Sequence, residues 1–323
     1  MADTLWGMTV PPAAGVRVAF QALPASVRSA VERACGSPVV EARTQPGGFS
    51  PGVAARVSCA DGSRHFVKAV SAEVNRRSVE IYRQERDVLT ALEPFILASD
   101  LPIPRLRGSA DLDPWLALIL EDVDGQHPAE PWQPGELGRV MAALDRLAVA
   151  LTPAPIAVPT VGDKYGRAFT GWRRLAESGR QDGLDPWARA RLDDLADLEA
   201  TWEAHTVGDT LLHADVRADN ILLTDDDVVI VDWPHACRGA AFVDHVFFGP
   251  SVALQGGPEL TDLLALSAAG RSADPQQVAA TLCALGGYFT YQSLRPAPPG
   301  LPTVRAFQTA QGEVTRRWLA QLL

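Results

Sequence analysis

Strand patterns fill the first third of this chain and helix patterns fill most of the rest, and this order limits the folds open to it. Apolar or alternating runs predict strands at 39–43, 53–59, 64–70 and 115–120, and an apolar stripe predicts a helix at 77–92. Counting one more strand from the proline-punctuated stretch before the last run, we expect a five-stranded N-terminal unit. A helix-rich unit follows, so the fold class is α+β.

The second unit is predicted to be mostly helical. Its helix patterns lie at 137–151, 187–202, 261–269, 276–292 and 304–323. A short strand pair, 221–223 and 228–231, interrupts them and is joined by an acidic turn. We therefore expect two lobes, residues 1–124 and 125–323.

Composition excludes several classes of protein. The 323 residues carry 29 Lys and Arg against 39 Asp and Glu, a formal net charge of −10, and no basic cluster exceeds two residues. Nucleic acid is therefore not an expected partner, and a cationic ligand is mildly favoured. No apolar run approaches the roughly 20 residues of a membrane span, and no signal peptide is recognised, so a cytoplasmic location is expected. The four cysteines form no C-x-x-C pair, which argues against a structural zinc site or a disulfide framework.

The segment from Leu211 to Trp233 carries the strongest chemical signal. Asp215 lies in a polar loop, Asn220 immediately precedes the first hairpin strand, and Asp232 immediately follows the second. Antiparallel pairing brings Asn220 and Asp232 to the same end of the hairpin, where their oxygens suit Mg²⁺. Asp215 is placed to orient a hydroxyl or receive its proton. The bland interpretation, a solvated acidic turn, suits the residues at 225–227 better.

Lysine occurs only at Lys68 and Lys164, whereas the chain is rich in arginine. Lys68 lies within a predicted strand, where an ammonium needs an anionic partner. Glu85 lies on the apolar stripe of the helix at 77–92 and is the predicted partner. The alternative for Lys68 is an exposed position on an edge strand.

A glycine-bearing loop, residues 45–52, separates the first two predicted strands. Its Gly47, Gly48 and Ser50 suit close approach of backbone N–H groups to phosphate. The same loop fits G-x-S-x-G, the nucleophile elbow of serine hydrolases with Ser50 as nucleophile. That elbow requires a following helix, whereas a strand is predicted here, so this alternative is remote.

In order from Val39 to Asp244, these residues resemble the aminoglycoside phosphotransferase family of small-molecule kinases, which share a protein-kinase-like two-lobed fold. The resemblance implies that Gly47, Gly48 and Ser50 cover nucleotide phosphates, with Lys68 contacting phosphate and Glu85 as its partner. It also implies a hinge, in which the Glu121 carbonyl and the Val123 amide hold the base; a catalytic Asp215; and Asn220 and Asp232 as Mg²⁺ ligands. Gly239 and Asp244 resemble a structural element of the family. Arg217 would either stabilise the charge on the phosphoryl group in the transition state or act only as a structural ion-pair partner.

The resemblance implies transfer of the γ-phosphoryl group of ATP or GTP, with Mg²⁺, to a hydroxyl of a small molecule. An aminoglycoside or similar antibiotic is the expected acceptor. The alternatives are a metabolite of the choline, homoserine, methylthioribose or sugar type and, from another class, a nucleotide-binding regulator without turnover. We expect a monomer or a homodimer, with no nucleic-acid or membrane partner.

Overall fold

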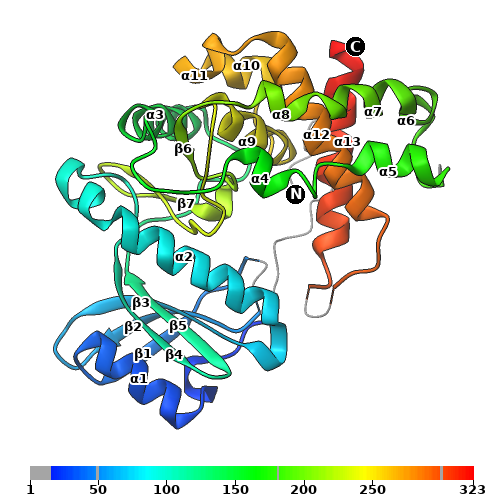
Figure 1. The fold of residues 1–323 in the computed structure, drawn as a ribbon. Helices are drawn as coiled ribbons and strands as arrows, with labels where there is room; N and C mark the ends of the chain where they lie inside the picture. The colour runs from blue at the N-terminus through cyan, green and yellow to red at the C-terminus, as the bar shows by residue number, and fades with distance from the viewer. Residues whose placement is uncertain (1–15, 49–50, 180–181, 299–300) are drawn as a thin grey trace.

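The computed structural model describes residues 16–48, 51–179, 182–298 and 301–323, which form two lobes (Figure 1). The N-terminal lobe holds an antiparallel five-stranded sheet in the order β1-β2-β3-β5-β4. Its elements are a 3₁₀ turn (Phe20–Ala22), α1 (Ala25–Cys35), β1 (Val39–Thr44), β2 (Val53–Cys59), β3 (Arg64–Ser71), α2 (Ala72–Ser99), β4 (Leu106–Leu112) and β5 (Trp115–Glu121).

The two N-terminal helices cover opposite faces of this sheet (Figure 1). On β3, Val67 and Ala69 are buried in the core beneath α1, whereas Val70 packs in the core that contains α2. This follows from the alternation of side chains along a strand, and it puts Lys68 on the α2 side.

Helix α2 is longer than the predicted helix at 77–92. It begins at Ala72, with Ser71 as its N-cap, but Asn75 leaves helical geometry at φ −157° and ψ 98°. The Asn75 side chain accepts a hydrogen bond from the Ser78 N–H, so it acts as an internal cap. The sequence pattern therefore located the middle of the helix and missed its first turn and its last residues, 93–99.

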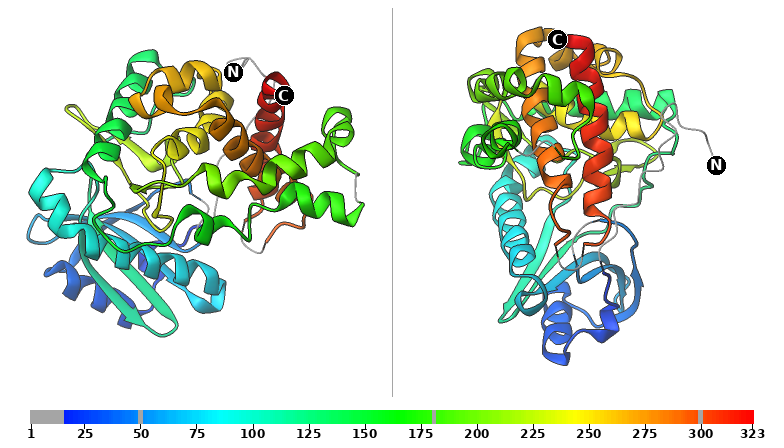
Figure 2. Two further views of the ribbon diagram at one scale, coloured as in Figure 1. Left: turned by 45° about the horizontal axis from the view of Figure 1, so that its top comes forward. Right: turned by 90° about the vertical axis from the view of Figure 1, so that its right-hand side faces the viewer.

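The C-terminal lobe is mostly helical, with two short antiparallel strand pairs, one of which is the hairpin. Its elements are α3 (Pro134–Ala150), α4 (Val161–Tyr165), α5 (Gly171–Ser178), α6 (Pro186–Ala190), α7 (Leu192–Ala200), α8 (Trp202–His205), β6 (Thr210–Leu212), a 3₁₀ turn (Ala218–Asn220), β7 (Ile221–Leu223), β8 (Val228–Ile230), β9 (Cys237–Gly239), α9 (Phe242–Leu254), α10 (Leu260–Ala265), α11 (Ala268–Ser272), α12 (Pro275–Ser293) and α13 (Val304–Leu322). Helices α12 and α13 pack side by side (Figure 2).

Two helical predictions in this lobe need correction, and one long helix was not predicted. The single helix expected at 187–202 is broken into α6, α7 and α8, and the helix at 261–269 into α10 and α11. The second break occurs because the buried Ser267 caps a new helix, accepting from the Gly270 N–H at 2.8 Å. Helix α9 was not predicted, because nearly all of its residues are buried and no apolar stripe distinguishes one face.

The largest core is shared by the two lobes. It contains Leu89 and Leu92 of α2 together with Val140 of α3 and Ile230 of β8. The connection after α2 also bonds directly to the C-terminal lobe, since the Ile230 N–H donates to the Pro102 carbonyl at 2.9 Å. The two-lobed α+β fold expected from the sequence is confirmed, although its lobes are joined by a common core.

A second core lies within the C-terminal lobe, where α5 crosses α12 at very close range. A Cβ atom added at Gly171 would lie 1.9 Å from the Gly287 carbonyl oxygen. Glycine is therefore required at this crossing. Within the described ranges, no helix combines the length and the apolar character that crossing a bilayer requires.

Candidate active site

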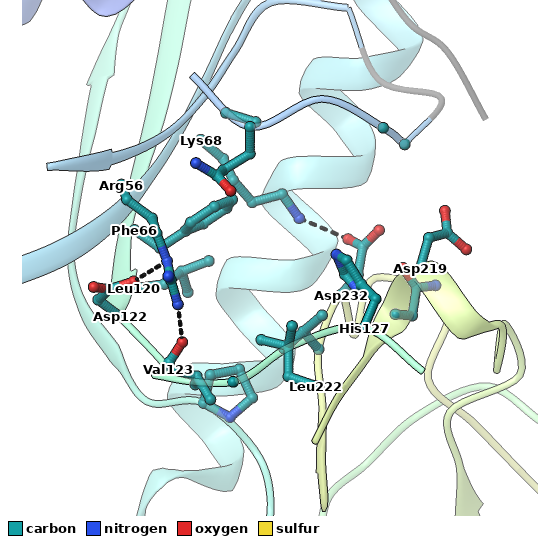
Figure 3. Close-up of a pocket in the computed structure, with 18 of the residues that line it drawn as sticks. Arg56, Phe66, Lys68, Leu120, Asp122, Val123, His127, Asp219, Leu222 and Asp232 are labelled. Atoms are coloured by element: carbon teal, nitrogen blue, oxygen red, sulfur yellow. Dashed lines mark hydrogen bonds and ion pairs between the residues drawn. The ribbon is translucent and has the colours of Figure 1, made fainter. Parts of the chain in front are cut away.

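A cavity of about 310 Å³ lies between the two lobes. The sheet contributes Phe66, Lys68 and Leu120, and the hairpin of the C-terminal lobe contributes Leu222 and Asp232 (Figure 3). In Figure 3 the charged groups of Lys68 and Asp232 lie on one side, away from Leu120 on the other. The cavity thus combines a polar, charged part with an apolar part.

Lys68 is the cation at the charged end of this cavity. Its Nζ atom lies 2.6 Å from Glu85 Oε2 and 2.6 Å from Asp232 Oδ1. Burial disfavours the ammonium, but the carboxylates of Asp232 and Glu85 outweigh that effect and raise the pKa of Lys68 above its ordinary value. The side chain is therefore charged at neutral pH, and the partner expected for it on the helix stripe is present.

Asp232 follows β8 in a left-handed backbone conformation, with φ of +70°. A non-glycine residue there is unusual and needs support from its surroundings. Burial favours the neutral acid, but the ammonium of Lys68 outweighs it and lowers the pKa of Asp232 to about 2. The hairpin pairs Ile221 with Ile230, and the Val231 N–H donates to the Asn220 carbonyl at 2.9 Å. This pairing brings Asn220 and Asp232 to one end of the hairpin.

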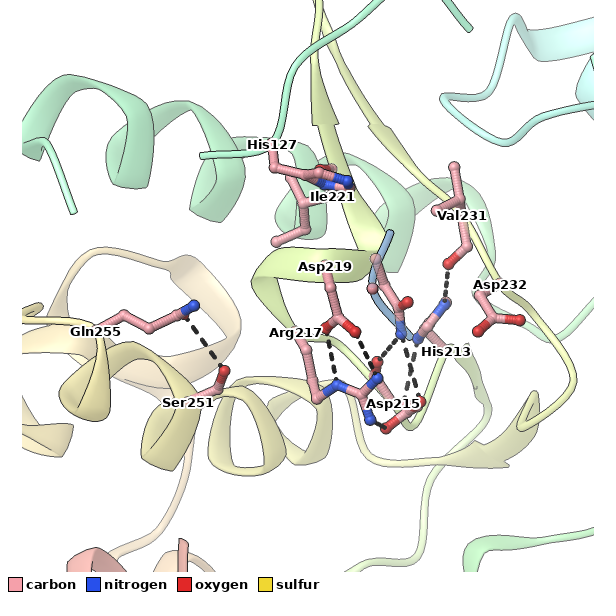
Figure 4. Close-up of polar contacts among 12 residues, drawn as sticks. His127, His213, Asp215, Arg217, Asp219, Ile221, Val231, Asp232, Ser251 and Gln255 are labelled. Atoms are coloured by element: carbon pink, nitrogen blue, oxygen red, sulfur yellow. Dashed lines mark hydrogen bonds and ion pairs between the residues drawn. The ribbon is translucent and has the colours of Figure 1, made fainter. Parts of the chain in front are cut away.

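Asp215 lies in the loop before the hairpin and is held by its neighbours (Figure 4). The Asn220 amide nitrogen donates to the Asp215 carbonyl at 2.9 Å and to its Oδ2 at 3.3 Å. Arg217 donates from Nη1 to Asp215 Oδ1 at 3.2 Å, and its Nε and Nη2 both donate to the carboxylate of Asp219 at 2.9 Å. Most of the guanidinium fork is thus engaged by Asp219, with one contact left for Asp215.

Asp244 of α9 holds the backbone of this loop through hydrogen bonds. The Asp244 carboxylate accepts from the His213 N–H at 2.9 Å and from the Ala214 N–H at 2.7 Å. Ala214 has φ of +61°, so it occupies a position that favours glycine. His213 Nε2 donates to the Val231 carbonyl at 3.0 Å and joins the loop to the hairpin (Figure 4).

Glu121 and Val123, at the connection between the lobes, also line the cavity. Val123 lies on the same side of it as Leu120 (Figure 3). Arg56 of β2 donates from Nη2 to the Val123 carbonyl and forms an ion pair with Asp122 at 2.8 Å. The Gly125 N–H donates to the same Val123 carbonyl at 3.0 Å. Among the described residues, no partner accepts from the Val123 N–H.

The glycine-bearing loop covers the cavity from the N-terminal lobe. Gly47 and Gly48 line it, with φ of +96° and +75°, whereas Ser50 lies outside the described residues. Arg17 also lines the cavity and donates to the Gly47 carbonyl. Neither Arg17 nor Arg56 was predicted from the sequence, because each is a single arginine outside any recognisable spacing.

The structure argues against the serine-hydrolase alternative. The loop that contains Ser50 connects β1 to β2, and both are strands of one antiparallel sheet. A nucleophile elbow requires a turn from a strand into a helix, which is absent from the described residues on both sides of this loop.

Asp215 is not among the residues that line the cavity, and parts of the C-terminal helices lie near its loop. The Arg217 guanidinium packs over the ring of Phe307 in α13, 5.8 Å from its centroid. Tyr288 of α12 is also near enough for the charge of Asp215 to raise the pKa of its phenol, although burial is the larger cause. The loop therefore has one side toward the cavity and another toward α12 and α13.

Residues 43–297 match the model of a family described as the phosphotransferase enzyme family. Homoserine kinase from Rhodospirillum rubrum is 29% identical over 154 residues, which is 44% of this chain and 45% of that relative. The match thus spans less than half the length of this curated relative.

Solved structures share the fold at low sequence identity. An aminoglycoside phosphotransferase from Alicyclobacillus acidocaldarius has a TM-score of 0.60 and 16% identity, covering 93% of this chain and 95% of that one. An amicoumacin kinase, solved in complex with AMP-PNP, Ca²⁺ and amicoumacin, has a TM-score of 0.53 and 11% identity, covering 82% and 85%.

Proposed function

The chain belongs to the phosphotransferase enzyme family, and on that premise we propose that it transfers the γ-phosphoryl group of ATP to a hydroxyl group of a small molecule. The observation that carries this proposal is the convergence of Lys68, Asn220 and Asp232 on one cavity whose other part is apolar. A nucleotide requires both parts, because its base is flat and mostly apolar and its phosphates are anionic.

In this proposal the base lies between apolar side chains of the two lobes, among them Ala54, Leu120 and Leu222. Lys68 contacts phosphate oxygens, and Glu85 holds it in place from α2. A compact ammonium fits between a carboxylate and phosphate better than a planar guanidinium does, which accounts for a lysine in an arginine-rich chain. Arg17, on the same cavity, is a second cation available to the phosphates.

The hinge favours adenine over guanine. The Val123 carbonyl already accepts from Arg56 and from the Gly125 N–H, so both of its lone pairs are used. Adenine needs one acceptor for its amino group and one donor for N1, which the Glu121 carbonyl and the Val123 N–H are placed to supply. Guanine presents N–H groups instead and would need a further acceptor. We therefore propose ATP rather than GTP as the donor.

Asn220 and Asp232 are the residues that would hold Mg²⁺. Their donor set fits a hard cation, because Asp232 is ionised and the Asn220 amide nitrogen is already bonded to Asp215, which leaves the amide oxygen for a cation. Bound there, the ion would neutralise charge on the phosphates. Lys68 must then release Asp232 and turn toward the phosphates while keeping Glu85.

Asp215 would accept the proton of the acceptor hydroxyl and orient its oxygen toward the phosphorus. Arg217 positions this carboxylate, because its fork is fixed on Asp219 and one NH group reaches Asp215. The acceptor itself would bind on the side of the loop toward α12 and α13.

An aminoglycoside or similar antibiotic remains the first acceptor class to test, in keeping with the net charge of −10. A second candidate is a metabolite that carries a carboxylate, of the homoserine type. The partial match to a homoserine kinase favours it.

The proposal is tested by measuring ATP consumption with Mg²⁺ across aminoglycosides, other antibiotics, amino alcohols, hydroxy amino acids and sugars. We expect one class to raise consumption above the rate without acceptor, and the Asp215→Asn variant to lose that increase. Calorimetric binding of ATP with Mg²⁺ separates the outcomes. Binding without turnover on any acceptor would favour a regulator, and no binding would contradict the proposal.

A further inference from the structure

Three side chains with metal-binding atoms meet on the N-terminal lobe, on the face of the sheet that α1 covers. The Sγ atoms of Cys35 and Cys59 and a ring nitrogen of His65 all lie within 4.8 Å of one another. None of the three lines the cavity between the lobes, so the phosphotransfer site does not account for them.

The fold fixes this meeting point through strand register. His65 on β3 pairs with Val57 on β2, and directly opposed residues share a face of the sheet. Cys59 lies two residues beyond Val57 and therefore points to the same face. Cys35 is the last residue of α1, which lies over this face.

The chain around the three residues is tied together by backbone contacts. The Ala60 N–H donates to the Pro38 carbonyl at 2.9 Å, and the Asp61 N–H donates to Ser37 Oγ at 3.2 Å. These bonds join the end of α1 to the β2–β3 turn. The relative positions of Cys35 and Cys59 are thus set by the scaffold and do not depend on a bond between the thiols.

His65 supplies an independent observation. Both of its ring nitrogens are buried, and neither has a hydrogen-bond partner among the described residues. Leaving a buried polar group unpaired costs about 1–3 kcal/mol, so such groups usually have a partner. A metal ion between the imidazole and the two thiols would give one of these nitrogens its partner.

We propose that Cys35, Cys59 and His65 bind a zinc ion, with water in the fourth tetrahedral position. Thiolate and imidazole ligands select zinc over Mg²⁺ and Ca²⁺, which prefer oxygen. The cysteine spacing argued against a structural zinc site, and this proposal reverses that expectation. The ligands are far apart along the chain and lack C-x-x-C spacing, so only the fold brings them together. The ion would join α1 to the β2–β3 turn and stabilise the N-terminal lobe.

Cobalt substitution tests the proposal on the full-length, reduced protein without nucleotide. Co²⁺ bound at this site should show a thiolate-to-metal charge-transfer band and the strong visible bands of tetrahedral cobalt, both abolished by zinc. Asp232 and Asn220 contain no sulfur, so Co²⁺ bound at the phosphotransfer site cannot give the charge-transfer band. Zinc should also raise the Tm of the wild type, because it binds only the folded chain.

Cys35 is half-buried, and Cys35→Ser is the main variant. Cys283→Ala is the control, since Cys283 is a free thiol in the other lobe. Cys35→Ser should lose the charge-transfer band and the zinc-dependent rise in Tm, and Cys283→Ala should keep both. His65→Gln should lose the tetrahedral visible bands. Absence of the band in the wild type, its persistence in Cys35→Ser, or a Cys35–Cys59 disulfide in place of metal in the purified protein would each overturn the proposal.

Discussion

The Nζ atom of Lys68 lies 2.6 Å from a carboxylate oxygen of Asp232, across the cavity between the lobes. One residue belongs to β3 of the N-terminal sheet and the other to the segment after β8, so this ion pair closes the cavity at its charged end. Glu85 holds the same ammonium at 2.6 Å. Lys68 can therefore leave Asp232 and still have one carboxylate as its partner. The Lys68–Asp232 ion pair can thus be replaced by a contact between Lys68 and phosphate when a nucleotide binds.

The Lys68–Asp232 ion pair should make the free energy of unfolding depend on pH in the acid range. The pKa of Asp232 is lowered from 3.8 to about 2, so its contribution is complete above pH 3.8 and is lost as the pH falls through about 2. The Asp232 side chain is 34% exposed, and solvent screens the pair. Its contribution to the free energy of unfolding is therefore only about 1 kcal/mol. Urea unfolding should show that the difference between wild type and Asp232→Asn shrinks between pH 5 and pH 2. The exposed Asp226→Asn should show no such change, and a constant difference for Asp232→Asn would contradict the prediction.

Asp215→Asn should reduce kcat by about 100- to 10,000-fold, the usual contribution of a positioned general base. The affinity for ATP should be nearly unchanged, because Asp215 does not line the cavity. Steady-state kinetics on the acceptor found by screening, with calorimetry for ATP, measure the two effects. Asp226→Asn serves as the surface control, and near-normal turnover in Asp215→Asn would remove the proposed role.

Arg217→Lys should reduce kcat by about tenfold, which corresponds to one hydrogen bond to a charged group. A lysine cannot contact both oxygens of Asp219 and still reach Asp215. The KM for ATP should stay constant, since the effect acts through the position of Asp215. If kcat were retained and only the Tm fell, Arg217 would be a structural ion-pair partner alone.

Removing Arg56 should relax the choice of nucleotide. Arg56→Ala frees the Val123 carbonyl, and we expect the ratio of kcat/KM for GTP to that for ATP to rise by about tenfold. Arg64→Ala is the matched control, because Arg64 also pairs with Asp122 at 2.8 Å, but within the described part of the chain it makes no hydrogen bond to Val123. An equal change in both variants would attribute the effect to Asp122 and would contradict the proposed role of the carbonyl.

Gly171→Ala should destabilise the fold by about 1–3 kcal/mol or more, because the new methyl group would meet the Gly287 carbonyl. Gly138→Ala is the opposite case. Gly138 lies on an exposed face of α3 with open space around its Cα, so alanine should raise stability by about 0.5–1 kcal/mol. Thermal unfolding of both variants checks the pair, and equal effects would show that the α5–α12 crossing can relax.

Local patterns account for the part of the site that the sequence predicted. Asn220 and Asp232 flank one hairpin, so strand pairing alone brings them together. Lys68 and Glu85 were matched because a buried strand position and the apolar stripe of a helix both need a partner for a charge. These inferences use short-range geometry, which the periodicity of the sequence records.

The features that were missed depend on contacts between distant segments. Arg17 and Arg56 reach the cavity because of where their chain segments lie, and no spacing distinguishes them from the other arginines. The meeting of Cys35 with Cys59 depends on how α1 crosses the sheet. Helix α9 is buried all round, so its apolar sequence could not indicate which face, or even which kind of element, to expect.

The core that α2 shares with α3 and β8 bears on how such chains recombine. An exchange at Gly125, between this chain and a relative, would keep the sheet and the hairpin intact but would set Leu89 and Leu92 against side chains selected for another helix. A chimera is expected to tolerate the exchange only if the residues of α2 and the Pro102 connection come from the same parent as the C-terminal half. The segment that must come from one parent is therefore larger than the C-terminal lobe, because it includes α2.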